Sequence, residues 1–148
     1  MTDSAVKAVR PELFAETLRR RTKAFAFSVL RLCRTLPQTD EGRVISRQLL
    51  RCGMSVGANY RAVTRSRSNA EFIAKVGIVI EEADEALFWL EALSETGICN
   101  PEPIRPLTRE GNELLSILVA AQRTARTRRK ERASSSRLSI RNSPLRKS

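Results

Sequence analysis

The sequence predicts an all-α protein, an antiparallel up-down-up-down four-helix bundle followed by a disordered basic tail. Apolar residues recur at alternating steps of three and four in four successive segments, which is the pattern of helices with one buried face. Ala, Leu, Arg and Glu are abundant, and all of them favour helices. Only short breaks separate the segments, as in antiparallel bundles. We expect the bundle over residues 1–132 and the tail over 133–148.

The first two helices are predicted over residues 11–36 and 40–65. Pro11 suits a first helical turn, because its missing N–H would have no partner there. The stripe of the first helix consists of Leu18, Thr22, Phe25, Val29, Leu32 and Leu36. The stripe of the second consists of Ile45, Leu49, Cys52, Val56, Asn59 and Val63. Asn59 is therefore expected in the seam, and Cys52 is expected to be a small core residue.

The last two helices are predicted over residues 69–96 and 101–132. Ser68 and Glu71 form a capping box, and Gly97 is expected to be a left-handed cap. Asn100 is expected to cap the fourth helix, with Pro101 in its first turn. The stripes are Phe72, Val76, Val79, Ala83, Ala86, Leu90 and Leu93, and then Ile104, Leu107, Gly111, Leu114, Leu118 and Ala121. From Ala133 the chain is Ser-rich and basic without an apolar period, which predicts disorder.

The composition restricts the classes of function. The chain has 148 residues and a formal charge of +11, which favours an anionic partner and nucleic acid first. It has no histidine, which removes Ser-His-Asp and Cys-His catalysis, and its three cysteines form no CxxC pair. We therefore expect no catalytic residues, no cofactor and no metal. No apolar run is long enough for a signal peptide or a membrane span, so a cytoplasmic location is expected.

Charge is unevenly distributed along the chain. Residues 68–97 hold one basic and seven acidic side chains, whereas the other segments are basic. Three basic clusters are expected to meet at one end of an antiparallel bundle: Arg19, Arg20, Arg21 and Lys23; Arg61, Arg65 and Arg67; and Arg126, Arg128 and Arg129. One such cluster is commonly just a solvated face, but three together favour phosphate contacts. Aromatic residues are too few for base stacking, so weak sequence specificity is expected.

The acidic row of the third helix has two interpretations. Glu81, Glu82, Asp84 and Glu85 could belong to a carboxylate metal site, but such sites need Glu-x-x-His pairs or carboxylates from facing helices. The chain offers no histidine, and its second helix has no acidic residue beyond Glu41. We therefore expect a salt-bridged face against the second helix or against a neighbouring copy.

Small and polar residues interrupt the middle of the second helix. Counting outward from the turn near Arg67, Gly57 lies level with Gly77, so these glycines are predicted to face each other and permit close packing. Ser55 and Asn59 lie one turn apart and are predicted to form a buried polar pair that fixes the register of the bundle. The alternative is that they contact a ligand directly.

A known family shows the same residues. Gln48, Arg51, Ser55 and Asn59, with Gly77, Glu82 and Glu85 in the third helix, resemble the bacterial four-helix-bundle family encoded in intervening sequences of 23S ribosomal RNA. This family includes the accessory variability proteins of diversity-generating retroelements, and the similarity spans about residues 15–125. The resemblance implies a homo-oligomer, a pentameric barrel of bundles, and no enzyme. For the retroelement members it implies binding of nucleic acid and of a reverse transcriptase.

One departure from the family pattern follows Asn59. Many members continue Asn-Ile-Ala-Glu-Gly, whereas this chain continues with Tyr60, Arg61 and Ala62, so a role for the family's glutamate does not carry over. The sequence thus predicts an oligomeric, non-enzymatic protein that binds RNA or DNA through phosphates. The alternative is an adaptor that recruits an enzyme such as a reverse transcriptase, with its basic charge matching an acidic protein partner.

Overall fold

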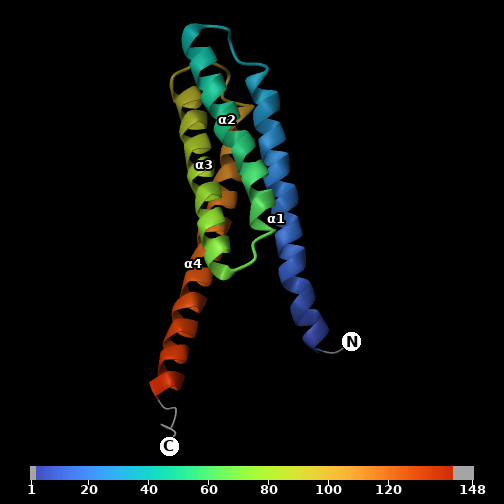
Figure 1. Ribbon diagram of the computed structural model, residues 1–148. Coiled ribbons are helices and arrows are strands. Elements are labelled where there is room, and N and C mark those ends of the chain that lie inside the picture. Colours follow the sequence, from blue (N-terminus) through green and yellow to red (C-terminus); the bar gives the residue numbers. More distant parts are fainter. Residues whose placement is uncertain (1–2, 142–148) are drawn as a thin grey trace, which may run out of the picture.

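Four helices form an antiparallel bundle in the computed structural model, which describes residues 3–141 (Figure 1). They are α1 (Asp3–Cys33), α2 (Asp40–Val63), α3 (Asn69–Glu95) and α4 (Ile104–Arg141). Each helix packs along the next one in the chain, whereas α1 and α4 touch each other much less. The all-α four-helix bundle predicted from the sequence is confirmed.

The predicted apolar stripes form the core. Phe25, Leu49, Leu90 and Leu114 are among the largest fully buried side chains, and each comes from a different helix. Cys52 is buried, as expected, and Cys33 is buried as well. Thr22 lies in the core with its hydroxyl donating to the carbonyl of Leu18 at 2.8 Å, so its burial leaves no unpaired polar group.

The predicted helix ends are largely correct. Ser68 caps α3 by accepting from the N–H of Glu71 at 3.1 Å, but the Glu71 carboxylate accepts from the N–H of Arg67 at 2.8 Å and not from that of Ser68. Gly97 has a φ of 70°, which confirms the left-handed cap. The N–H of Glu102 donates to the Asn100 side chain at 3.0 Å, and a turn over residues 101–103 precedes the start of α4.

Two helices are longer than the sequence predicts. α1 begins at Asp3, so Pro11 lies inside it and not in its first turn. α4 continues to Arg141, so the prediction of disorder is wrong for residues 133–141, and residues 142–148 lie outside the described part. The sequence contains no glycine or proline between Gly111 and Pro144, so nothing in this stretch breaks a helix.

The prediction that Gly57 and Gly77 face each other is wrong. A Cβ on Gly57 would lie 3.1 Å from the Ala26 Cβ of α1, and a Cβ on Gly77 would lie 3.2 Å from the Gln122 side chain of α4. The glycines lie on different faces, because equal distance from a turn fixes height along a helix and not direction around it. The close approach of α1 and α2 instead involves Gly57 and Gly53.

The buried polar pair is also absent. Ser55 and Asn59 are half-buried, and their side chains make no hydrogen bond to any residue that the structure describes. The core position belongs to Tyr60, which is 4% exposed. Tyr60 is the fourth residue after Val56. The buried stripe of α2 therefore continues from Val56 by a step of four, whereas the predicted stripe continued by a step of three to Asn59. Asn59 is thereby turned from the core towards α3.

Candidate nucleic-acid interface

The first basic cluster joins α1 to α2. Arg19, Arg20 and Lys23 of α1 share a shallow hollow with Arg61 of α2 and with Glu16. Arg19 binds Glu16 through two hydrogen bonds of 2.8 and 3.0 Å, which raise the pKa of its guanidinium. Arg20 and Arg61 are exposed and make no ion pair with a described residue, so no acidic side chain of the described chain neutralises their charges. We call Arg20, Lys23 and Arg61 the lateral cluster.

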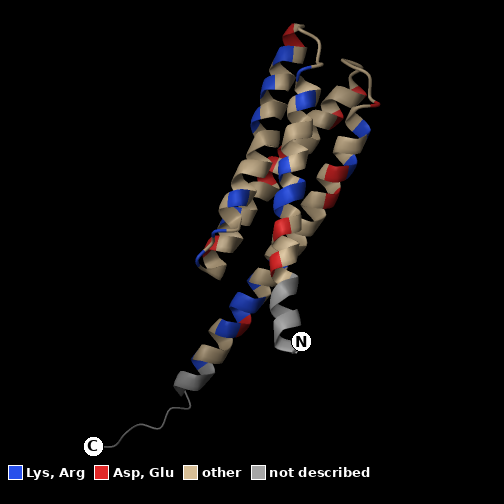
Figure 2. Cartoon of the chain, turned by 90° about the vertical axis from the view of Figure 1, so that its right-hand side faces the viewer, with Lys and Arg blue, Asp and Glu red and all other residues tan. Residues whose placement is uncertain are grey.

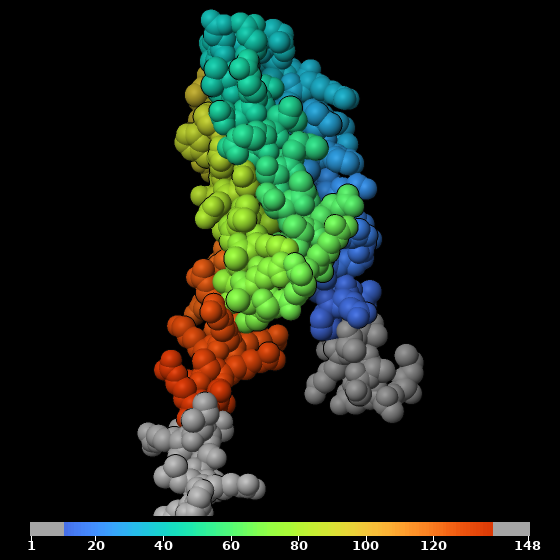
Figure 3. Space-filling view, in the orientation of Figure 1, coloured from blue at the N-terminus to red at the C-terminus, as the bar shows by residue number. Residues whose placement is uncertain are grey.

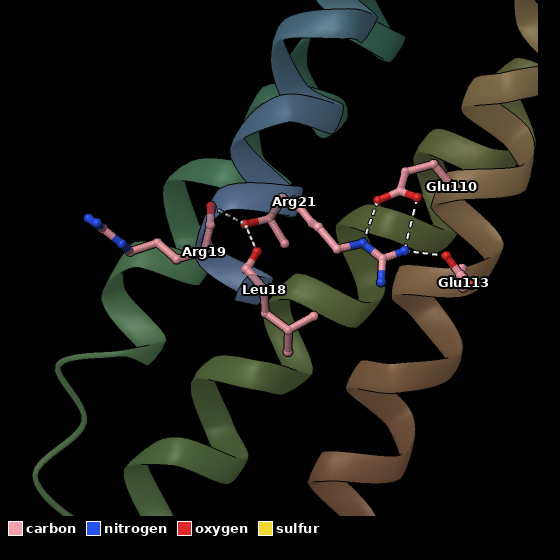
Figure 4. A network of polar contacts seen from close by, with 6 residues as sticks. Leu18, Arg19, Arg21, Glu110 and Glu113 are labelled. Atoms are coloured by element: carbon pink, nitrogen blue, oxygen red, sulfur yellow. Dashed lines mark hydrogen bonds and ion pairs between the residues drawn. The ribbon is translucent and has the colours of Figure 1, made fainter. Parts of the chain in front are cut away.

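Arg21 does not belong to the lateral cluster. Its guanidinium donates to both carboxylate oxygens of Glu110 in α4, at 2.8 and 2.9 Å, and it also binds Glu113 (Figure 4). Hydrogen bonding to Glu110 raises its pKa further above its usual range. The structure therefore corrects the grouping of Arg21 with Arg19 and Arg20: it connects α1 to α4 and its charge is already matched.

The end of α4 projects beyond the bundle. Ala125 is its last buried residue, and the side chains over 126–137 are all exposed (Figure 3). We call residues 126–141 the arm. It carries seven basic residues and one acidic residue, and lysine and arginine follow one another along it (Figure 2). Arg126, Arg128 and Arg129, which the sequence singled out, lie at its base. None of the charged side chains over residues 126–137 forms an ion pair with a described residue.

The turn between α2 and α3 lies beside the base of the arm. The side-chain amide of Asn69, at the start of α3, donates to the carbonyl of Ala125 at 2.7 Å. Arg65 and Arg67 lie just before Asn69 and are exposed, without a side-chain ion pair to a described residue. The second and third predicted clusters thus lie at the same end of the bundle, and Arg61 of the second also shares the hollow of Arg19, Arg20 and Lys23 (Figure 1).

The residues of the family pattern lie together on a different surface. Gln48, Arg51, Ser55 and Asn59 recur at steps of three and four along one side of α2, the side from which Arg51 reaches α3. Arg51 binds Glu82 at 3.3 Å and also binds Glu85, and hydrogen bonding to Arg51 lowers the pKa of the Glu85 carboxyl. The expectation that the acidic row meets α2 is correct for these two glutamates. In the described part of the chain, no group of His, Cys, Asp or Glu residues could hold a metal ion.

Exposed apolar side chains border this pattern. Ile78 is 47% and Phe88 58% exposed, and Phe88 packs edge-on against Trp89, whose indole N–H donates to Glu85 at 3.3 Å. We call this surface, which consists of Gln48, Arg51, Ser55, Asn59, Ile78, Glu82, Glu85, Phe88 and Trp89, the α2/α3 face. Ser55 and Asn59 of this face lie outside the core and make no hydrogen bond to a described residue, so contacts within one chain do not explain them.

The comparisons with known proteins decide the family. The model of the 23S rRNA-intervening sequence protein family matches residues 17–120. The chain belongs to this family. A similar solved structure is that of a protein of unknown function from the S23 ribosomal protein family of Bacteroides thetaiotaomicron. It is 30% identical, with a TM-score of 0.66, and the alignment covers 71% of this chain and 97% of that one. A search of curated proteins found no match.

The match to the 23S rRNA-intervening sequence protein family covers the bundle and ends before the arm, which begins at residue 126. The family pattern therefore does not account for the arm. Sequence reasoning also missed the partners of Arg21 and the helical conformation of residues 133–141, which include Arg137. The signal for the arm was the absence of glycine and proline over residues 112–143. None of the described helices is long and apolar enough to span a membrane.

Proposed function

We propose that this protein binds RNA or DNA through phosphate contacts made by the arm, the lateral cluster and the α2–α3 turn. The observation that carries the proposal is that these three regions present exposed basic side chains that lack acidic partners among the described residues. Arginine side chains without partners favour phosphate, because the guanidinium can donate two parallel hydrogen bonds. The family description refers to the 23S rRNA intervening sequence, which makes an RNA hairpin the first probe.

Sequence-specific readout is not part of the proposal. The only tyrosine, Tyr60, lies in the core, and Trp89 lies among the glutamates of the α2/α3 face. Neither is placed to stack on bases beside the basic clusters. Binding should therefore depend on charge and be similar for unrelated sequences.

The adjacent arginines of α1 provide a matched test. The affinity for a labelled RNA hairpin, measured by fluorescence anisotropy at four salt concentrations, should fall linearly on a log–log plot. Each phosphate contact that is lost should reduce the slope by about 0.7 to 0.9. Arg20→Gln and Arg61→Gln should each have this effect, whereas Arg21→Gln should not, because Glu110 and Glu113 already hold Arg21.

The arm is tested with a triple variant in which Arg126, Arg128 and Arg129 become glutamine. It should weaken binding about equally for two unrelated hairpins. Absence of binding at low salt, or binding that neither the triple variant nor Arg61→Gln alters, would contradict the proposal and favour the protein adaptor.

We also propose that copies of the chain associate through the α2/α3 face. Exposed Ile78 and Phe88 lie beside charged residues of both signs, a composition that suits contact with another protein surface. The double variant Ile78→Asp and Phe88→Asp should reduce the mass measured by light scattering. Val119→Asp is the control, because Val119 is also exposed, at 46%, but lies on α4. A monomeric wild-type protein at tens of micromolar would refute this association.

A further inference from the structure

A cavity of about 740 Å³ opens where the arm leaves the bundle, and all four helices line it. Phe14 and Leu18 of α1, Phe72 and Val76 of α3, and Ile117 and Ala121 of α4 give it an apolar wall. It exists because α1 and α4 are in less contact than the other neighbouring helices. Its volume lies within the range of about 300–1,000 Å³ that is typical of sites for small molecules.

Tyr60 contributes an unpaired polar group to this cavity. The residue is only 4% exposed, and its hydroxyl makes no hydrogen bond to any described residue. No fully enclosed side-chain nitrogen or oxygen among the described residues lacks a partner, so this hydroxyl must reach the open volume. Burial raises the pKa of Tyr60 to about 12, so the group is a neutral hydrogen-bond donor at neutral pH.

The polar groups lie at the outer end of the cavity. Tyr60 and Asn69 also line the smaller hollow beside the α2–α3 turn, and Asn69 lies level with Ala125. Arg128 is the one charged side chain among the described lining residues, and it has no ion pair with a described residue. Ile117 lies eleven residues before Arg128, about 16 Å along the helix, so the apolar wall extends inward from the polar end.

We propose that this cavity binds an amphipathic anion, a molecule with an extended apolar body and a single carboxylate or similar head group. The body lies against Leu18, Val76 and Ile117, and the head group accepts a hydrogen bond from Tyr60 and pairs with Arg128. An anion is specified because the lining contains an arginine and no acidic residue among the residues described. The cavity shares only Arg128 with the proposed nucleic-acid interface, and the test below uses no nucleic acid, so the two proposals can fail separately.

Sodium decanoate, kept below the concentration at which it forms micelles, is a suitable probe for calorimetric titration of the full chain. Saturable binding of one molecule per chain is expected. Arg128→Gln should weaken decanoate binding about tenfold, in line with the loss of a charged hydrogen bond, and leave binding of the uncharged decanol unchanged. Arg123→Gln is the matched control, because Arg123 is exposed on the same helix but does not line the cavity. Tyr60→Phe should weaken decanoate binding several-fold.

Blocking the cavity separates internal binding from adsorption to the surface. Ala121→Phe should abolish binding of both probes while circular dichroism shows an intact fold. If that variant does not fold, Thr124→Trp replaces it, because Thr124 is an exposed residue at the rim. Absence of saturable decanoate binding, or binding that a folded blocking variant leaves unchanged, would overturn the proposal. Decanoate binding that Arg128→Gln does not weaken would overturn the assignment of an anion.

Discussion

Glycines in the same bundle leave very different amounts of room beside them. A Cβ on Gly53 would lie 2.7 Å from a methyl carbon of Val29, which is fully buried and has a stiff side chain. A Cβ on Gly77 would meet only the end of the Gln122 side chain, at 3.2 Å. The first glycine is therefore required by helix packing, whereas the second is not.

Alanine substitutions should separate these two glycines. Gly53→Ala should lower the free energy of unfolding by about 1–3 kcal/mol, because Val29 cannot move away without disturbing the core. Gly77→Ala should be neutral or should stabilise by up to about 1 kcal/mol, because alanine favours the helix and Gln122 can shift. Urea unfolding of both variants measures the difference, and equal effects would contradict this interpretation.

Two buried groups, the thiol of Cys52 and the hydroxyl of Tyr60, should make the free energy of unfolding fall at alkaline pH. Burial raises the pKa of Cys52 from 9.0 to about 12 and that of Tyr60 from 10.0 to about 12. The folded state therefore retains protons that the unfolded state releases. The resulting stability is fully present below pH 9 and is lost as the pH rises from 9 towards 12, by up to about 1.4 kcal/mol per pH unit for each group.

Urea unfolding at pH 8, 9 and 10 tests this expectation. Cys52→Ala should remove part of the decline between pH 9 and 10, because Tyr60 contributes mainly above pH 10 and burial also raises the pKa of Cys33. Cys99→Ala is the control, because Cys99 is only partly buried. A decline that is the same in the wild type and in Cys52→Ala would show that other groups cause it.

Single positions also mark the limit of prediction from sequence. The stripes around Phe25, Leu49 and Leu114 were predictable because most core positions repeat with the helical period. Steps of three and of four from Val56 both fit that period, so the choice between Asn59 and Tyr60 depended on how α2 lies against its neighbours. The partner of Arg21 was equally hidden, because Glu110 is 89 residues away in the chain.

At the scale of helices, the arm of α4 has no apolar face to bury. We expect a variant that ends at Thr127 to keep the cooperative unfolding and melting temperature of the bundle, since no described side chain beyond Ala125 is buried. Its binding to an RNA hairpin should be much weaker and less dependent on salt. Calorimetry and anisotropy measure the two properties, and a substantial fall in melting temperature would show that the arm packs on the bundle.

The last part of the arm, residues 133–141, was not predicted to be helical. Disorder was inferred from the missing apolar period, but a helix can continue from a well-packed one without burying a stripe of its own. Continuing a helix adds one hydrogen bond per residue, whereas starting one is costly, and the packed part of α4 has already provided the start. Prediction from periodicity detects helices that pack and misses such extensions.

At the scale of the molecule, the seam between α1 and α4 has fewer contacts than the other three interfaces between neighbouring helices. The bridge from Arg21 to Glu110 and Glu113 spans this seam between two cavities of about 740 Å³ each. Arg21→Gln should lower the free energy of unfolding by about 1 kcal/mol, and less at high salt, because the pair is partly exposed. Arg19→Gln is the control and should have a much smaller effect, because its bridge to Glu16 is exposed to solvent and lies within one helix. Equal losses in urea unfolding would show that the seam does not depend on the bridge.

Like charges along the arm oppose its own helix. Arg126 and Lys130 lie four residues apart, as do Arg128 and Arg132, and such pairs repel on a helix surface. A polyanion that neutralises them would remove this repulsion, so helix content and phosphate binding are thermodynamically linked, and each must favour the other. Circular dichroism at 222 nm should therefore grow more negative when RNA is added at low salt. The same linkage makes concentrated salt, which screens the repulsion, strengthen the helix while it weakens the complex.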